Sequence, residues 1–219
     1  MRPRTALFGQ ICLPLLQIDA KMTKQYKYVL ASNSPRRREL MAGLGVEFEV
    51  RVMKGISESY PADLPAADVP AYISREKAAA YTVASDELLV TADTVVIVDN
   101  QILGKPADAA DAHRMLRLIS GRSHEVVTGV CLTTADKQRV FSVVSEVTFK
   151  DLTDDEIDYY IEHYRPFDKA GAYGIQEWIG YVGVTALHGS YFNVMGLPVQ
   201  RIYEELTTEF GLKLNTLHH

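Results

Sequence analysis

Three arginines directly follow a helix-start signal near the beginning of the chain. In the stretch LASNSPRRREL, Ser34 supplies a hydroxyl that commonly caps a helix N-terminus, and Pro35 has the fixed φ that suits the first helical position. A first helical turn carries free N–H groups and a partial positive charge, and therefore favours acidic side chains. Arginines at this place instead favour a bound anion such as a triphosphate. We assign this role to Arg36 and Arg37, and we interpret Arg38 as solvent-exposed.

An aspartate interrupts the most apolar stretch of the chain. LLVTADTVVIV, residues 88–98, is typical of a strand buried on both faces, yet it contains Asp93. A buried carboxylate is costly unless it is paired, bound to a metal or used in catalysis. A salt bridge to a neighbouring element is the structural alternative. The adjacent Thr94, and Lys105 on the returning arm of an expected hairpin, favour a functional site.

A predicted helix over residues 67–85 places two charges near its apolar face. Five apolar residues mark that face: Val69, Tyr72, Ile73, Ala80 and Val83. Glu76 falls in the middle of the face, and we interpret it as one partner of an internal ion pair. Lys77 falls at its edge, from which a long side chain can extend to an anion. Two arginines, two lysines and a strand carboxylate together indicate phosphate chemistry with Mg²⁺.

The remaining patterns predict a mixed α/β fold around one long sheet, because strand and helix signals alternate. Strands are expected at 26–32, 46–52, 88–98, 124–134 and 139–149. Helices are expected at 35–44, at 67–85, between Asp108 and Gly121, after a capping box of Thr153 and Glu156, and at 197–210. A glycine-rich segment, 171–183, is expected to lead into a short hairpin around His188 and Gly189.

Composition limits the classes of function. The 219 residues are 47% hydrophobic and 23% charged, which is typical of a globular protein, and the net charge of -5 argues against a nucleic-acid partner. Cys12 and Cys131 form no metal-binding or disulfide pattern, so we expect a cytoplasmic protein with no membrane partner. We interpret residues 1–25 as an N-terminal extension before a single domain over 26–219. Met22 lies just before the first expected strand, and an alternative translation start there explains the extension at least as well as a targeting role does.

Six motifs carry a resemblance to a known family. LASNSPRRREL, SREKA, TADTVV, GKP, SGRSHEVVTGV and DKAGAYGIQ occur in this order. Over residues 26–212 the chain resembles the Maf family of nucleoside triphosphate pyrophosphatases. The resemblance implies an α/β fold with an elongated mixed sheet, flanking helices and a cleft between two lobes. It also implies hydrolysis of a nucleoside triphosphate to the monophosphate and pyrophosphate with Mg²⁺ or Mn²⁺. AGAYGIQ resembles the branch that acts on dTTP and UTP.

The resemblance also implies roles for individual residues. Substrate-binding roles fall on Ser32, Arg36, Arg37, Glu58, Thr94 and Gln176, and catalytic roles on Asp93, Lys77 and Lys105. Asp93 would accept a proton from water, and Asp93 with Glu58 would hold the metal. Lys77 and Lys105 would offset the charge of the polyphosphate.

Three points stay open at the level of sequence. Glu177 replaces the glycine that commonly follows GIQ in the family, so metal affinity or base selectivity could differ. His124 belongs to a matched motif, but we interpret it as structural. A nucleotide-binding regulator of septum formation with little turnover remains the alternative function, and a homodimer is compatible with the sequence.

Overall fold

The structure is a computed structural model that describes residues 25–213. The extension expected over 1–25 therefore lies almost entirely outside the described residues. The strands are β1 (Lys27–Leu30), β2 (Phe48–Val50), β3 (Glu87–Val98), β4 (Gln101–Leu103), β5 (Ser123–Thr133), β6 (Gln138–Phe149) and β7 (Val184–His188). The helices are α1 (Pro35–Ala42), α2 (Val69–Ala79), α3 (Ala109–Ile119), α4 (Asp154–Tyr164), α5 (Trp178–Gly183), α6 (Tyr191–Met195) and α7 (Val199–Glu209). Two 3₁₀ turns are η1 (Ala66–Asp68) and η2 (Ala170–Ala172).

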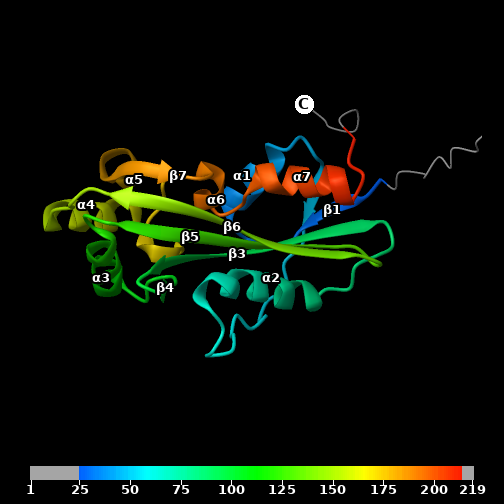
Figure 1. The fold of residues 1–219 in the computed structure, drawn as a ribbon, viewed down its shortest axis with the longest axis horizontal. Coiled ribbons are helices and arrows are strands. Elements are labelled where there is room, and N and C mark those ends of the chain that lie inside the picture. Colours follow the sequence, from blue (N-terminus) through cyan, green and yellow to red (C-terminus); the bar gives the residue numbers. More distant parts are fainter. Residues whose placement is uncertain (1–24, 214–219) are drawn as a thin grey trace, which may run out of the picture.

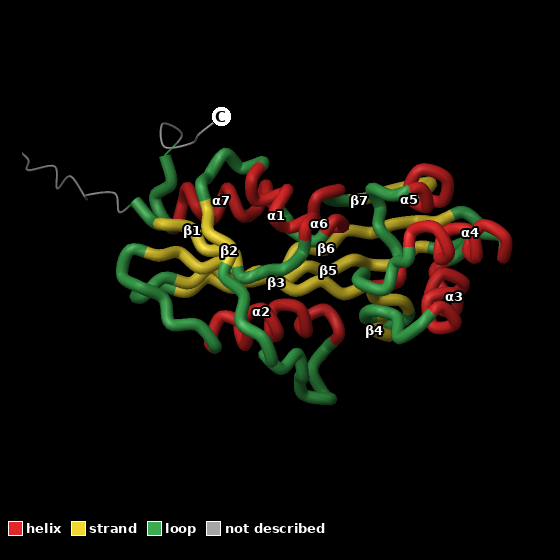
Figure 2. The backbone as a smooth tube through the Cα atoms, turned by 180° about the vertical axis from the view of Figure 1, so that it is seen from behind, coloured by secondary structure: helices red, strands yellow, loops and turns green. Residues whose placement is uncertain are grey.

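The seven strands form one mixed sheet, as predicted. Its order is β2-β1-β3-β5-β6-β7, and β4 pairs with the far end of β3. The long antiparallel strands β3, β5 and β6 run through the whole molecule (Figure 1). A first lobe, formed by β1, β2 and α1, lies at one end of these strands. A second lobe, formed by β4, α3 and α4, lies at the other end (Figure 2).

The edge of β3 is open between the two lobes. β1 pairs in parallel with residues 87–90 of β3, and β4 pairs with residues 96–98. No strand among the described residues pairs with this edge over 91–95, the stretch that contains Asp93. The backbone groups of this short stretch are therefore accessible to side chains and to a ligand.

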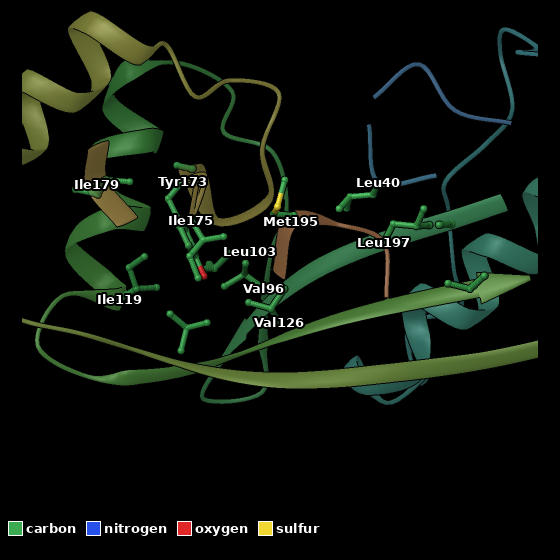
Figure 3. Close-up of a cluster of buried hydrophobic side chains, with 14 of the residues drawn as sticks. Leu40, Val96, Leu103, Ile119, Val126, Tyr173, Ile175, Ile179, Met195 and Leu197 are labelled. Carbon is green, nitrogen blue, oxygen red and sulfur yellow. The ribbon is translucent and has the colours of Figure 1, made fainter. Parts of the chain in front are cut away.

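Helices cover both faces of the long strands. α2 lies on one face, whereas α1, α6 and α7 lie on the other (Figures 1 and 2). One large cluster of buried side chains extends under both lobes. Figure 3 shows part of it, where residues of the second lobe such as Leu103 and Ile119 continue toward Leu40 of the first lobe and Leu197, which follows α6. The two lobes are thus joined by packing as well as by the sheet.

Helix ends follow the predicted signals closely. The Ser34 side chain accepts a hydrogen bond from the N–H of Arg37 and caps α1, with Pro35 at the first position. Asp108 caps α3, and Thr153 with Glu156 forms the capping box of α4. No helix of the described residues is long and apolar enough to cross a membrane.

The helix predicted over 67–85 is wrong at its C-terminal end. α2 ends at Ala79, so Val83 does not belong to it, and Ala80 is exposed. The buried face therefore runs through Val69, Pro70, Ile73, Ser74 and Ala78. Glu76 is exposed, and its predicted internal ion pair is wrong. Lys77 is the charged residue that this face directs inward.

The hairpin predicted around His188 and Gly189 is also wrong. β7 ends at His188 and pairs with β6, and the next element is the helix α6. The glycine-rich segment before it contains η2 and α5. The alternation of apolar and polar residues could not show that the strand paired with β7 lies about forty residues earlier in the chain.

Candidate active site

A cleft of about 790 Å³ lies at the open edge of β3, between the lobes. Its volume is in the range of pockets that enclose small-molecule ligands. Five cations line it: Arg36, Arg37, Lys77, Lys105 and Lys169. Three carboxylates, Glu58, Asp93 and Asp168, also line it, so the charged side chains of the lining sum to +2. An anionic ligand is therefore favoured here, although the whole chain carries a net charge of -5.

Asp93 is held by a lysine that also binds a second carboxylate. The Nζ atom of Lys77 lies 2.8 Å from Oδ1 of Asp93 and 2.7 Å from Oε1 of Glu58. The side chains of Lys77 and Asp93 are only 15% and 14% exposed, so each charge is stabilised by the other. The second oxygen of Asp93, Oδ2, makes no hydrogen bond to any described residue. It is free to accept one from a ligand or a water molecule.

A glycine determines how close α2 comes to Asp93. Gly129 of β5 lies opposite Asp93 across the strand pair. A Cβ atom at Gly129 would lie 2.2 Å from the backbone of Pro70 and Ala71, which is a severe overlap. The absence of a side chain lets the start of α2 contact the strand directly. Two turns later, the helix delivers Lys77 to Asp93.

Arg37 connects three parts of the cleft. Its guanidinium donates to the carbonyls of Ala92 and Gly196 at 2.8 Å each, and to the hydroxyl of Thr94 at 3.0 Å. The Ala92 carbonyl belongs to the unpaired stretch of β3. Thr94 also exchanges a 2.9 Å hydrogen bond with Thr128. Burial lowers the pKa of Arg37, whereas the charge of Asp93 acts to raise it.

Arg36 and Arg38 differ in their location, as the sequence predicts: one lies at the cleft and the other at the surface. Arg36 lies at the cleft and forms a 3.0 Å ion pair with Asp168 of the opposite lobe. Arg38 is exposed and lies outside the cleft lining, which confirms its interpretation as a surface residue. Ser32 is buried beside the start of α1, where its hydroxyl accepts a hydrogen bond from the N–H of Ser34.

Lys105 and Gln176 face the cleft with unused polar groups. Lys105 follows β4, is exposed, and has no ion-pair partner among the described residues. Partial burial acts to raise the pKa of Glu58, but Lys77 and Lys105 outweigh it and keep that pKa below its usual value. The side-chain oxygen of Gln176 is buried without a hydrogen-bond partner in the described part of the chain. A buried acceptor of this kind normally has a partner, which a ligand would supply.

Comparison with known proteins identifies the family. The model of a family described as Maf-like protein matches residues 27–209. The chain belongs to the Maf-like family. It is 60% identical to the dTTP/UTP pyrophosphatase of Phocaeicola vulgatus over 185 residues, 84% of this chain and 96% of that protein. It is 57% identical to the dTTP/UTP pyrophosphatase of Parabacteroides distasonis, over 84% of this chain and 96% of that protein. The dTTP/UTP pyrophosphatase of Flavobacterium johnsoniae is 48% identical with the same coverage.

The site residues that the sequence predicts all lie at one cleft of this Maf-like protein. All nine line it: Ser32, Arg36, Arg37, Glu58, Lys77, Asp93, Thr94, Lys105 and Gln176. The hydroxyl of Thr94 is already engaged by Arg37 and Thr128. The roles assigned to these residues remain predictions, because proximity does not establish a role.

Sequence reasoning missed two charged residues of the cleft, Asp168 and Lys169. Lys169 is buried, and its Nζ lies 2.8 Å from Oδ1 of Asp168 and 3.1 Å from Oε1 of Glu177. The other carboxylate oxygen of Glu177 accepts a hydrogen bond from the hydroxyl of Tyr160. Glu177 itself does not line the cleft. The available signal was the pair of opposite charges at the start of the DKAGAYGIQ motif.

The residues of the cleft fit a divalent cation that arrives with a triphosphate. Mg²⁺ commonly uses one or two carboxylates together with substrate phosphates and water. Glu58 and Asp93 converge on the same Nζ of Lys77 and so supply two neighbouring carboxylates. No group of three or more potential metal-ligating side chains is present among the described residues. The donor set therefore suits a metal–phosphate complex better than a metal bound by the protein alone.

Proposed function

We propose that this Maf-like protein hydrolyses dTTP and UTP to the nucleoside monophosphate and pyrophosphate, as a cytoplasmic enzyme of nucleotide metabolism. The observation that carries the proposal is the Lys77-bound Asp93 at the open edge of β3, inside a cleft of net positive charge. A carboxylate with one free oxygen can accept a proton from water, and the surrounding cations can hold a polyphosphate. The preference for pyrimidine nucleotides is supported by the relatives, which are named dTTP/UTP pyrophosphatases.

The cleft residues divide the chemistry between them. Water attacks the α-phosphorus, and Oδ2 of Asp93 receives the proton that the water loses. Arg36, in α1, and Lys105, after β4, both line the cleft and offset the charge that develops on the departing pyrophosphate. Arg37 keeps the unpaired edge of β3 in place through the Ala92 carbonyl.

A divalent cation, Mg²⁺ or Mn²⁺, would be held by Glu58 and Asp93. When bound, it supplies charge neutralisation for the phosphate oxygens. The ammonium of Lys77 orients both carboxylates toward the cleft. The Thr94 hydroxyl accepts a hydrogen bond from the guanidinium of Arg37 and is itself hydrogen-bonded to Thr128, so the position of Arg37 is tied to β3 and β5.

Measurement of pyrophosphate release from a panel of nucleotides tests the proposal. The panel contains dTTP, UTP, CTP, ATP, GTP and 7-methyl-GTP, each with Mg²⁺ and with Mn²⁺, and Asp93→Asn serves as the blank. We expect dTTP and UTP to be turned over much faster than the others. In ¹⁸O-labelled water the label should enter the monophosphate, because attack falls on the α-phosphorus. Preference for 7-methyl-GTP, release of orthophosphate, or label in the pyrophosphate would contradict the proposal.

A further inference from the structure

An ion-pair chain crosses the rim of the cleft from one lobe to the other. Arg36 of α1 contacts Oδ2 of Asp168 at 3.0 Å, and Oδ1 of the same carboxylate accepts from Nζ of Lys169 at 2.8 Å. All three side chains line the cleft. One carboxylate thus lies between two cations, with one oxygen directed to each. A phosphate group bridges paired cations in the same manner.

The two carboxylates that contact Lys169 have unequal surroundings. The side chain of Asp168 is 58% exposed, whereas that of Glu177 is 21% exposed and that of Lys169 only 8%. Glu177 is also fixed from its far side by the hydroxyl of Tyr160, a fully buried residue of α4. Burial raises the pKa of Tyr160, and the hydrogen bond to Glu177 raises it further, so the hydroxyl remains a donor.

These surroundings give the two ion pairs different strengths. A buried ammonium without a partner is strongly unfavourable, so Lys169 needs a carboxylate that stays. Glu177 meets this need because it is partly buried and anchored. The pairs made by Asp168 are weaker, because its own carboxylate is more than half exposed and water screens its charge. A phosphate, which carries more charge and more acceptor oxygens, can replace such a partner.

We propose that the space between Arg36 and Lys169 is a phosphate subsite that the Asp168 carboxylate fills when no triphosphate is bound. A phosphate group of the substrate takes both cations, and Asp168 turns into solvent. Glu177 keeps Lys169 at the cleft throughout. This inference rests on the proposed function, since it concerns the triphosphate of the same cleft. It assigns Lys169 to substrate binding and makes Glu177 a positioning residue.

The proposal predicts that substitutions of two neighbouring residues, Asp168 and Lys169, change the affinity for the triphosphate in opposite directions. Asp168→Asn removes the competing charge but keeps the shape, so the triphosphate no longer has to displace an anion. Lys169→Met removes one of the two cations that bind the phosphate and keeps most of the side-chain volume. If the chain were only structural, both changes would act in the same direction, because each breaks the same pair.

The experiment compares KM for dTTP, the inhibition constant for inorganic tripolyphosphate, and the melting temperature across a set of full-length variants. We expect Asp168→Asn to lower KM and the inhibition constant by about threefold to tenfold, and Lys169→Met to raise both by a similar factor. In both variants the change in kcat should be smaller than the change in KM. Glu177→Gln should raise KM in the same direction as Lys169→Met. Matched controls are Asp154→Asn, at an exposed residue, and Lys150→Met, at a half-buried one; both residues form ion pairs outside the cleft.

Two outcomes would overturn the subsite. One is a higher KM in both Asp168→Asn and Lys169→Met; the other is a loss of activity in both that follows the folded fraction. Asp168→Ser provides a second test should the asparagine variant fold poorly. Calorimetric binding of tripolyphosphate measures the subsite without turnover. If the parent protein hydrolyses no nucleotide but these affinities still move in opposite directions, the proposed function fails while the subsite stands.

Discussion

One carboxylate oxygen of Asp93, Oδ1, is bound by Lys77, whereas Oδ2 is free in the cleft. The first oxygen therefore fixes the side chain, and the second can accept a proton from water. Asp93→Asn keeps the size of the side chain and removes the charge. We expect kcat for dTTP to fall by about 10²–10⁴-fold, the range typical for loss of an acid–base group. Nucleotide binding should persist, because Arg36 and Lys105 still face the phosphates. Turnover, nucleotide affinity and melting temperature are measured on one preparation.

The same variant separates the enzyme from a regulator of septum formation. A folded Asp93→Asn protein that hydrolyses dTTP at the parent rate would remove Asp93 from the mechanism. A division phenotype on overexpression that this variant retains in full would favour the regulator. Reduced melting temperature with activity in proportion to the folded fraction would instead make Asp93 a structural residue.

Arg36 and Arg37 are adjacent, but their contacts predict different consequences of substitution. Arg37→Lys keeps the charge, yet an ammonium cannot reproduce the three guanidinium bonds to Ala92, Gly196 and Thr94. We expect it to lower the free energy of unfolding by about 2–4 kcal/mol, since carbonyls at a partly buried site lose their donor. Arg36→Lys should leave stability nearly unchanged and raise KM only slightly. Denaturant unfolding and KM for dTTP provide the measurements.

Arg38→Ala is the control for this pair, because Arg38 is exposed outside the cleft and its side chain donates, among the described residues, only to Asn33. Stability and KM should both stay near the parent values. A larger effect at Arg38 than at either neighbour would show that α1 presents a different face to the substrate.

The charged residues of the cleft show which site residues can be predicted from the sequence and which cannot. Asp93 and Lys77 were recognisable because a charge inside an apolar pattern is expensive and therefore needs a partner. Glu76 was misassigned because the apolar face was drawn through Ala80 and Val83, which lie beyond the end of α2. Lys169 was missed because a glycine-rich loop has no periodicity from which burial could be judged.

At the scale of elements, the contact between α2 and β5 is the feature that determines the spacing of the site. Gly129→Ala would place a Cβ atom 2.2 Å from the backbone of Pro70 and Ala71, so α2 must move away. We expect a loss of stability of about 1–3 kcal/mol, as for other overpacked sites. The larger effect should be on kcat, because Lys77 moves away from Asp93 with the helix.

Gly43→Ala at the end of α1 is the matched control, because the nearest atom to its added Cβ is 3.3 Å away. Thermal unfolding and kcat are measured for both variants. Equal small losses in the two would mean that α2 adjusts without displacing Lys77.

The prediction of elements succeeded where local chemistry determines structure. Capping residues gave the starts of α1, α3 and α4, because their hydrogen bonds form within a few residues. The partner of β7 could not be deduced, since β6 ends thirty-five residues before β7 begins. The open edge of β3 was equally hidden, because it depends on where two unrelated strands stop.

At the scale of the whole molecule, buried His124 predicts how stability changes with pH. The residue is 3% exposed, its Nε2 forms a 2.7 Å hydrogen bond with the hydroxyl of Tyr173, and burial lowers its pKa to about 4. Between pH 6.5 and 4 the unfolded chain binds a proton here that the folded chain does not, so stability falls as the pH falls. The loss from this group is on the order of 3 kcal/mol over that range.

Replacement of His124 by Gln isolates this effect, since Gln retains a group that can bond to Tyr173. We expect the parent to lose more stability than His124→Gln between pH 6.5 and 4, as measured by denaturant unfolding. Identical pH profiles would show that the imidazole becomes protonated in the folded protein without cost.

The three long strands also determine how the two halves of the molecule can move. β3, β5 and β6 each pass beneath both lobes without interruption, and no flexible linker separates the lobes in the described residues. One lobe therefore cannot rotate against the other about a single hinge. Any narrowing of the cleft has to change the twist of the sheet over many residues at once.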